Sequence, residues 1–387
     1  MFPQFNFYST PLAVLYVWGV IISILLLVRY IKRRELSDLL LAAILLIFTF
    51  ERTTYTIGFM AWYDTYQNTK VNYFLIPMML AFGPLVYFYT KRVTTVNFQF
   101  SKKMIWHFIP QVILITIRLI IYLYDVNQSG FDDVQNGVLF QSQFMNVFNL
   151  ITYIVTDLSI AIYLLLAGHL IYQYQSKLNE VFSDAVKWEM QWLRNFLIVF
   201  ILYHVIMFVL TEVDNRIVDI SYQEYWWGHL FAAVSLIYLG VHGYFADITK
   251  LHRASVDAGA LSLSKPLADQ NTELIKNDTF KEVEAIMKQE KPYLNSNLTL
   301  AELAKMSQLN SQELSAAINQ SGINFNDFVN EYRVKAVQKA IQNGRAKEVT
   351  LLSIAHESGF NSKATFNRTF KKITQKSPSE YLKSIEE

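Results

Sequence analysis

The segment TLLSIAHESGFNS at 350–362 repeats TLAELAKMSQLNS at 299–311, and this repeat decides the fold of the C-terminal third of the chain. Six of the thirteen aligned positions are identical. In the first copy Thr299 and Glu302 have the spacing of a capping box, which predicts the start of a helix. Apolar residues at helical spacing followed by a polar turn are typical of a helix-turn-helix. Two copies indicate this motif more strongly than one.

The apolar anchors of the two copies have similar spacing. Leu314 and Ile318 lie four residues apart in the first copy, as Phe366 and Phe370 do in the second. Residues at this spacing share one face of a helix and can be buried together. Gly359 suits a turn that requires a positive φ. Because the second pair of anchors comes one residue later in its copy, we expect the turns or the helix starts to differ.

Residues 324–343 between the copies predict one long helix, with an apolar stripe that ends at Asn343 and Gly344. A helix of this length measures about 30 Å. That length is near the roughly 34 Å between successive major-groove faces of DNA. One chain would therefore place two recognition helices in adjacent grooves. A helical bundle that binds another protein is the alternative.

The two predicted helix-turn-helix motifs, which we place at 299–320 and 350–373, differ in the charge that they offer to DNA. The stretch 361–376 has five basic residues and no acid, whereas SQELSAAINQ at 311–320 has no base. We expect the second helix-turn-helix to supply most of the affinity for DNA, and the first to position the domain or to discriminate between sequences. The candidate DNA-contacting residues are Gln312, Ser315, Asn319, Lys363, Thr365, Arg368, Lys371 and Lys372. For each of them, an exposed polar side chain without a role is the alternative.

Residues 278–387 resemble the DNA-binding domain of AraC/XylS-family transcriptional regulators. The resemblance lies in LTLAELAKMSQLNSQELSAAIN, NFNDFVNEYRVKAV, SIAHESGFNSKATFNRTFKK and SPSEYLKS, in the order of the family. It implies tandem helix-turn-helix units on a connecting helix. By position, it also implies base-facing roles for Gln312, Ser315, Lys363, Thr365 and Arg368. Gln375 stands where the family commonly has glycine.

The composition separates this domain from the rest of the chain. The 387 residues are 52% hydrophobic and 17% charged, whereas a soluble domain has about 25% charged residues. The first 250 residues hold 32 charged side chains and the last 137 hold 34. The absence of cysteine excludes disulfides and thiolate chemistry. The first charged residue is Arg29, so the N-terminal apolar stretch lacks the basic start of a signal peptide.

Seven apolar stretches approach the roughly 20 residues that a helix needs to cross a membrane. They are 10–30, 38–62, 72–90, 103–124, 146–172, 190–212 and 222–246. Buried core helices of a large soluble domain are the alternative. We therefore predict an all-α chain, with a seven-helix membrane domain at 1–246 and a linker at 247–277. The DNA-binding domain follows at 278–387. The sequence does not choose between a rigid and a flexible linker.

The basic residues of the short loops predict the orientation. One side holds Arg29, Lys32, Arg33, Arg34, Lys91, Arg92, Lys102, Lys103, Lys177, Lys187 and Arg194, and the other holds Lys70 and Arg216. With seven spans, the N-terminus lies outside and the C-terminal domain in the cytoplasm. We expect a multi-pass protein of a bacterial inner membrane. The sequence allows a homodimer, because tethered tails gain local concentration.

Six ionisable residues fall within the predicted spans, where charge is costly and is usually functional. They are Glu51, Arg52, Arg118, Asp157, His204 and His229. The hypothesis is a polar cavity that binds a small ligand of unknown identity. Structural pairs, such as Arg118 with Glu51 or Asp157, are the alternative.

The prediction is a membrane-bound regulator whose tail binds double-stranded promoter DNA under control of the ligand. No catalytic residue, metal or cofactor is expected. A membrane enzyme built on His107, His169, His204, His229 or His242 is one alternative, although these residues lack the spacing of a metal site or triad. A transporter with a regulatory tail is the other, with only Gly83, Pro84 and Pro110 to interrupt the spans.

Overall fold

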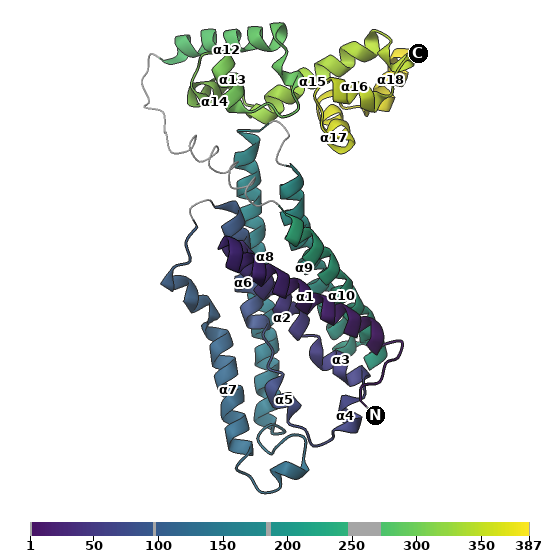
Figure 1. Ribbon diagram of the computed structural model, residues 1–387. Coiled ribbons are helices and arrows are strands. Elements are labelled where there is room, and N and C mark those ends of the chain that lie inside the picture. The colour runs from purple at the N-terminus through teal and green to yellow at the C-terminus, as the bar shows by residue number, and fades with distance from the viewer. Residues whose placement is uncertain (1, 96–97, 183–186, 247–271, 387) are drawn as a thin grey trace. The chain divides into compact units, whose positions relative to one another are not determined.

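The computed structural model describes residues 2–95, 98–182, 187–246 and 272–386; the side chains of 187–190, 272–279 and 386 lie outside this description. The described residues form helices joined by loops, with no strand and one isolated β-bridge among them (Figure 1). The predicted all-α fold class is confirmed.

The chain divides into two compact units. The first comprises residues 1–171 and 191–247, and the second comprises 172–190 and 248–387. The sequence predicted the division near 247 but not the assignment of 172–190 to the second unit. Residues 247–271 of the predicted linker lie outside the described residues. Its last part, 272–277, belongs to helix α12, which starts at Thr272.

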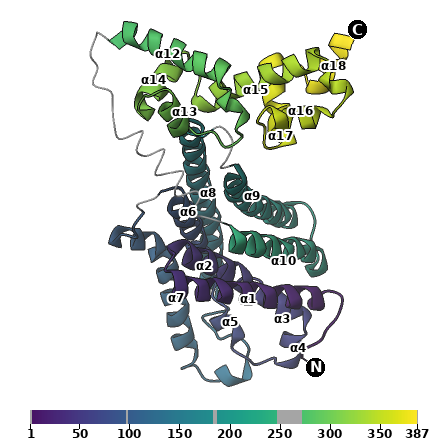
Figure 2. The ribbon, with the colours of Figure 1, turned by 45° about the horizontal axis from the view of Figure 1, so that its top comes forward.

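The helices before residue 247 follow one another through most of the predicted membrane domain. They are α1 (Ser9–Arg33), α2 (Leu36–Phe50), α3 (Thr53–Phe59), α4 (Trp62–Thr65), α5 (Val71–Phe74), α6 (Met79–Thr94), η1 (Lys102–Phe108), α7 (Ile109–Asp125), η2 (Phe131–Asp133), α8 (Gln143–Asn179), α9 (Lys187–Arg216) and α10 (Tyr222–Phe245). Helix α1 packs against α2 and α10, and α2 packs against α6 (Figures 1 and 2).

Six helical segments of the described chain are long and apolar enough to cross a membrane: Ser9–Arg33, Val71–Thr94, Lys102–Asp125, Gln143–Asn179, Gln191–Arg216 and Tyr222–Phe245. The predicted second span, 38–62, is absent from this set, and it is divided between separate helices. Helix α2 ends at Phe50 and α3 begins at Thr53, with Glu51 and Arg52 at the break. With fifteen residues, α2 measures about 22 Å, which is shorter than the hydrocarbon core. The prediction of one continuous helix at 38–62 is therefore wrong.

The second unit contains the helix-turn-helix repeat. After α12 (Thr272–Gln289) come η3 (Pro292–Leu294), α13 (Leu300–Met306), α14 (Ser311–Gln320), α15 (Phe325–Gln342), η4 (Arg345–Lys347), α16 (Leu351–Glu357), α17 (Lys363–Thr374) and α18 (Pro378–Glu386). Helices α13 and α14 form the first helix-turn-helix, and α16 and α17 the second. Figure 1 shows them at opposite ends of α15.

Helix α15 contributes to two separate hydrophobic cores. Phe325, Phe328 and Val329 pack with α12, α13 and α14. Val334, Val337 and Ile341 pack with α16 and α17, including Phe366 and Phe370. The predicted anchors Leu314, Ile318, Phe366 and Phe370 are all at most 2% exposed. Because each half of α15 is covered by a different helix-turn-helix, this one helix fixes the spacing between the two motifs.

The predicted caps and the predicted offset between the copies are confirmed. Thr299 and Glu302 form a reciprocal capping box at the start of α13. Asn310 caps α14, but Ser362 caps α17, one residue after the counterpart Asn361. The second recognition helix therefore starts one residue later, which explains the shifted anchors.

Arg333 joins the two cores at the centre of α15. Its side chain is fully buried, and its Nε and Nη2 donate to the carbonyls of Tyr293 at 2.8 Å and Asn295 at 2.9 Å. Burial lowers the pKa of Arg333 to about 10, so the guanidinium remains charged at neutral pH. The turn residue Gly359, at φ +91°, lies against the same Tyr293 carbonyl.

The segment after α8 pairs with the first helix-turn-helix inside the second unit. Phe182 forms a β-bridge with Thr299, and the Leu300 N–H donates to the Val181 carbonyl at 2.9 Å. Asn326 Nδ2 donates to the Phe182 carbonyl at 3.1 Å. The last turns of α8 therefore belong to the same compact unit as α13 and α15.

Candidate functional site

Helix α14 presents a neutral polar face. Gln312 and Asn319 are exposed and Ser315 is half-buried, whereas Leu314 and Ile318 point into the core. Asn319 Nδ2 lies 3.4 Å from Ser315 Oγ. The side chains available on this helix are short hydrogen-bonding groups suited to base edges and not to phosphate charge.

Helix α17 presents a basic face opposite its buried phenylalanines. Lys363, Arg368, Lys371 and Lys372 are all exposed. Lys372 Nζ pairs with Asp327 Oδ1 at 2.8 Å, at the first turn of α15. Lys371 lies within electrostatic reach of Glu380. Among the described residues, Lys363 and Arg368 form no ion pair, so these two are the most available to DNA.

Thr365 does not share this face, contrary to the expectation from the sequence. It is 5% exposed, and its N–H and hydroxyl both contact the hydroxyl of the N-cap residue Ser362. Thr365 directly precedes the buried Phe366 and lies four residues before the buried Thr369, so it lies on the buried face of α17. We leave Thr365 out of the interface proposed below.

Asn367 is an exposed residue of α17 that the sequence analysis missed. It lies four residues after Lys363 and four before Lys371, so the three share one stripe of the helix. The helical spacing from Lys363 was the signal that could have identified it.

The first unit brings three of the six predicted ligand-binding residues together. We call Phe48, Arg52, Tyr203, His204 and His229 the Arg52 cluster. The Arg52 guanidinium carbon lies 3.8 Å from the Phe48 ring centre and 4.5 Å from that of Tyr203. His204 follows Tyr203 on α9, His229 is on α10, and both are within electrostatic reach of Arg52. The Glu51 carboxylate accepts the Met78 N–H and lies within electrostatic reach of Arg52, although it is not one of the five residues of the cluster.

Arg118 and Asp157 have other neighbours. Arg118 Nη2 donates to Asn149 Oδ1 at 2.8 Å, and its guanidinium lies 5.3 Å from the Phe140 ring. Asp157 is near Tyr153 and the charge of Glu212. The alternative pairing of Arg118 with Glu51 or Asp157 is not formed. The six residues therefore do not line one cavity.

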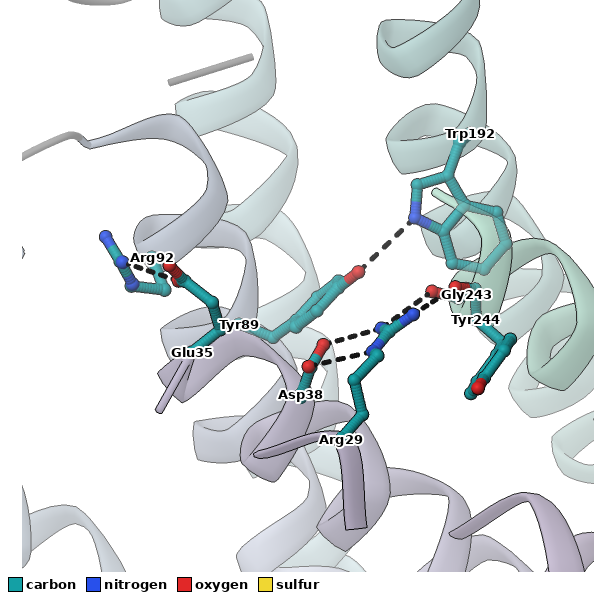
Figure 3. A network of polar contacts seen from close by, with 8 residues as sticks. All are labelled: Arg29, Glu35, Asp38, Tyr89, Arg92, Trp192, Gly243 and Tyr244. Carbon is teal, nitrogen blue, oxygen red and sulfur yellow. Dashed lines mark hydrogen bonds and ion pairs between the residues drawn. The ribbon is translucent and has the colours of Figure 1, made fainter. Parts of the chain in front are cut away.

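A second polar network, which the sequence analysis missed, ties the ends of five helices together (Figure 3). Arg29 of α1 holds the Asp38 carboxylate with Nε at 2.8 Å and Nη2 at 2.5 Å. Its Nη1 and Nη2 also donate to the carbonyls of Tyr244 and Gly243, the last turn of α10. Nearby, Trp192 Nε1 lies 3.3 Å from the Tyr89 hydroxyl. A second pair joins Arg92 and Glu35 at 3.0 Å. Arg29 therefore fixes the end of α10, the last helix before residues 247–271.

Within the part of the chain that the structure describes, no group of three His, Asp or Glu side chains could hold a metal ion.

Comparison with known proteins identifies the C-terminal region. Residues 303–384 match the family described as a helix-turn-helix domain. Neither a curated protein nor a solved structure matches the chain. The second unit thus contains an AraC-type helix-turn-helix domain, joined to a region with six candidate membrane spans. Such a domain indicates a DNA-binding transcription regulator.

Proposed function

We propose that the chain is a membrane-bound one-component regulator whose tail binds promoter DNA under control of a ligand in the membrane domain. The observation that carries this proposal is the pair of helix-turn-helix units on a single helix, α15, whose two ends are packed into separate cores. A bacterial inner-membrane location and a homodimer remain predictions of the sequence.

The geometry of α15 supports binding to adjacent major grooves. Its eighteen residues correspond to about 27 Å. The recognition helices α14 and α17 pack on opposite ends of this rod, and groove faces recur every 34 Å or so. A monomer would then read a site of about 20 base pairs, a task for which other helix-turn-helix proteins use a dimer.

The two recognition helices differ in their proposed contributions. Lys363 and Lys371 of α17 would contact phosphates, whose neutralisation makes binding sensitive to salt. Arg368 has the planar fork that can hold guanine O6 and N7. Gln312 of α14 could pair with adenine in the same bidentate manner. Most of the affinity would thus come from α17, and α14 would add discrimination.

A mutational series on α17 tests this division. In the full chain reconstituted in nanodiscs, Arg368→Ala should weaken specific binding by about 1–3 kcal/mol and relax the sequence preference. Lys371→Ala should weaken all sequences alike and reduce the salt slope by about one. Lys372→Ala is the matched control and should have a smaller effect, because Lys372 Nζ already pairs with Asp327. Footprints and affinities over a salt series measure all three. Failure of the wild-type chain to bind DNA at low salt would refute the function.

The proposed topology places the N-terminus outside and the second unit in the cytoplasm. Six crossings would put both ends on one side, whereas seven put them on opposite sides. The proposal therefore requires α2 and α3 together to make one crossing despite the break at Glu51 and Arg52. The loop bias of eleven basic residues against two supports this orientation.

Cysteine labelling distinguishes the two topologies, and the chain has no cysteine of its own. We expect Gln4→Cys to react with a membrane-impermeant maleimide in intact cells, and Lys383→Cys to react only after permeabilisation. Both positions are exposed in their own units. Equal labelling of the two variants before permeabilisation would contradict the proposed seven crossings.

Control of DNA binding requires a ligand with different affinity for two arrangements of the helices. Two chain segments could carry the change. One is the end of α10, which Arg29 holds before residues 247–271. The other is α8, whose continuation pairs with Thr299, Leu300 and Asn326.

A further inference from the structure

Two interrupted helices meet beside the Arg52 cluster. Helices α2 and α3 are separated at Glu51 and Arg52, and α5 and α6 are separated between Phe74 and Met79. The Glu51 carboxylate accepts the Met78 N–H and so connects the two breaks. In a membrane, irregular backbone is tolerated only where protein or a cavity surrounds it. Broken helices in membrane proteins often surround bound ligands or ions.

Arg52 is held in one orientation, and two of its three nitrogens have no hydrogen-bond partner in the described part of the chain. It is 5% exposed, and its Nη1 donates to the Phe48 carbonyl. The rings of Phe48 and Tyr203 lie within 3.8 and 4.5 Å of its guanidinium carbon. Among the described residues, Nε and Nη2 have no hydrogen-bond partner and no carboxylate pairs with this arginine. The Glu51 carboxylate acts on this charge but forms no ion pair with it, so the two nitrogens of the buried guanidinium that are unused within the described residues are available to an anionic ligand.

Another arginine of the chain, Arg29, shows which chemical group the Nε and Nη2 atoms can bind. Arg29 uses the same two atoms, Nε and Nη2, to hold both oxygens of the Asp38 carboxylate (Figure 3). Two parallel N–H···O bonds of this kind match the geometry of a carboxylate. Arg52 presents the same pair of donors from a fixed side chain.

Two imidazoles add further polar atoms around this cation. His204 Nε2 and His229 Nδ1 are buried and lack partners within the described chain. His204 is fixed by its Nδ1 contact with the Phe200 carbonyl at 2.8 Å, and His229 by stacking on Tyr55 at 3.7 Å. Arg52 is the only arginine or lysine of the cluster, and the Glu51 carboxylate lies within its electrostatic reach. These charges favour a ligand with one negative charge over a phosphate dianion.

We propose that the Arg52 cluster binds a small monocarboxylate, whose carboxylate pairs with Nε and Nη2 of Arg52 and whose apolar part contacts the surrounding rings. The inference rests on the proposed function and names the class of its ligand.

The first test needs no ligand. In the purified full chain, Arg52→Met should raise the thermal unfolding temperature by several degrees, because it removes a buried charge that no carboxylate of the described residues contacts directly and two nitrogens that have no acceptor there. The matched control Arg29→Met should lower it, because Asp38 and two carbonyls lose their donor. A fall for Arg52→Met comparable to that for Arg29→Met would overturn the proposal, since Arg52 would then be a structural residue.

The second test uses acetate, benzoate and octanoate, each beside its neutral amide. At least one carboxylate should raise the unfolding temperature of the wild-type chain while its amide does not. Arg52→Lys keeps the charge but loses the fork, so it should bind that carboxylate at least about tenfold more weakly. No stabilisation by any of the three, or equal binding by Arg52→Lys, would overturn the site.

Measuring DNA affinity with and without the active carboxylate separates this inference from the proposed function. Carboxylate binding without a change in DNA affinity would support the site and refute ligand control. If no carboxylate binds but DNA binding is intact, only the proposal of a carboxylate site is refuted.

Discussion

Gly359→Ala is expected to unfold the second helix-turn-helix locally and to abolish binding to its half of the DNA site. Gly359 has φ +91°, which disfavours a residue with a Cβ by about 1–2 kcal/mol. An added Cβ would lie 2.2 Å from the Tyr293 carbonyl oxygen and 3.0 Å from Arg333 Nε. Such overpacking costs a further 1–3 kcal/mol or so. Amide exchange of α16 and α17 should therefore accelerate about 100-fold or more.

Gly322→Ala is the matched control for this prediction. Gly322 also has a positive φ, +79°, but an added Cβ would meet nothing within 4 Å. Its cost should be limited to the backbone, about 1–2 kcal/mol, and confined to the turn before α15. If the two variants exchanged at equal rates, the close contact with Tyr293 would have no energetic role.

The helices of the second unit could be predicted from the sequence because the signals that specify them are local. Caps, turn glycines and anchors four residues apart act within a few residues, and Thr299, Gly359 and Phe370 behave as these rules require. The one-residue offset was visible in the anchors, although its source, the cap at Ser362 in place of Asn361, was not.

The features missed in the first unit depend on contacts between distant residues. Apolar periodicity continues across 38–62, so it cannot indicate that Glu51 leaves the helix to accept the Met78 N–H. Likewise, Arg29 counted as a loop charge in the sequence, but in the structure it is an internal partner of Asp38 and the end of α10. Hydropathy locates spans and leaves open which charges pair.

The pairing of 181–182 with the first helix-turn-helix could not be predicted for another reason. The Leu300 N–H and the Val181 carbonyl are backbone atoms, and the group that accepts from Asn326 Nδ2 is the backbone carbonyl of Phe182. Every residue carries such atoms. Sequence patterns report side chains and are therefore silent about such a contact. Because the end of α8 belongs to the compact unit that contains α13 and α15, a change there acts directly on that unit.

Arg333→Met is expected to destabilise both cores of the second unit by about 3–5 kcal/mol. The substitution leaves the carbonyls of Tyr293 and Asn295 without their donor, at roughly 1–3 kcal/mol each. It also removes a contact with Asn330 Oδ1 at 3.3 Å. Since Arg333 lies between the two cores, amide exchange should accelerate in α13 and α14 as well as in α16 and α17.

The same substitution elsewhere tests the reasoning behind this prediction. Arg345→Met removes an exposed arginine that pairs with Glu348 and Glu357, and it should leave amide exchange unchanged. Arg52→Met should have the opposite sign, because Arg52 is also buried, at 5% exposed against 0% for Arg333, but two of its nitrogens lack acceptors among the described residues. Burial of the charge is common to Arg52 and Arg333, so it cannot account for opposite signs. Only the supply of hydrogen-bond acceptors can, and unchanged amide exchange in Arg333→Met would show that this supply does not decide stability.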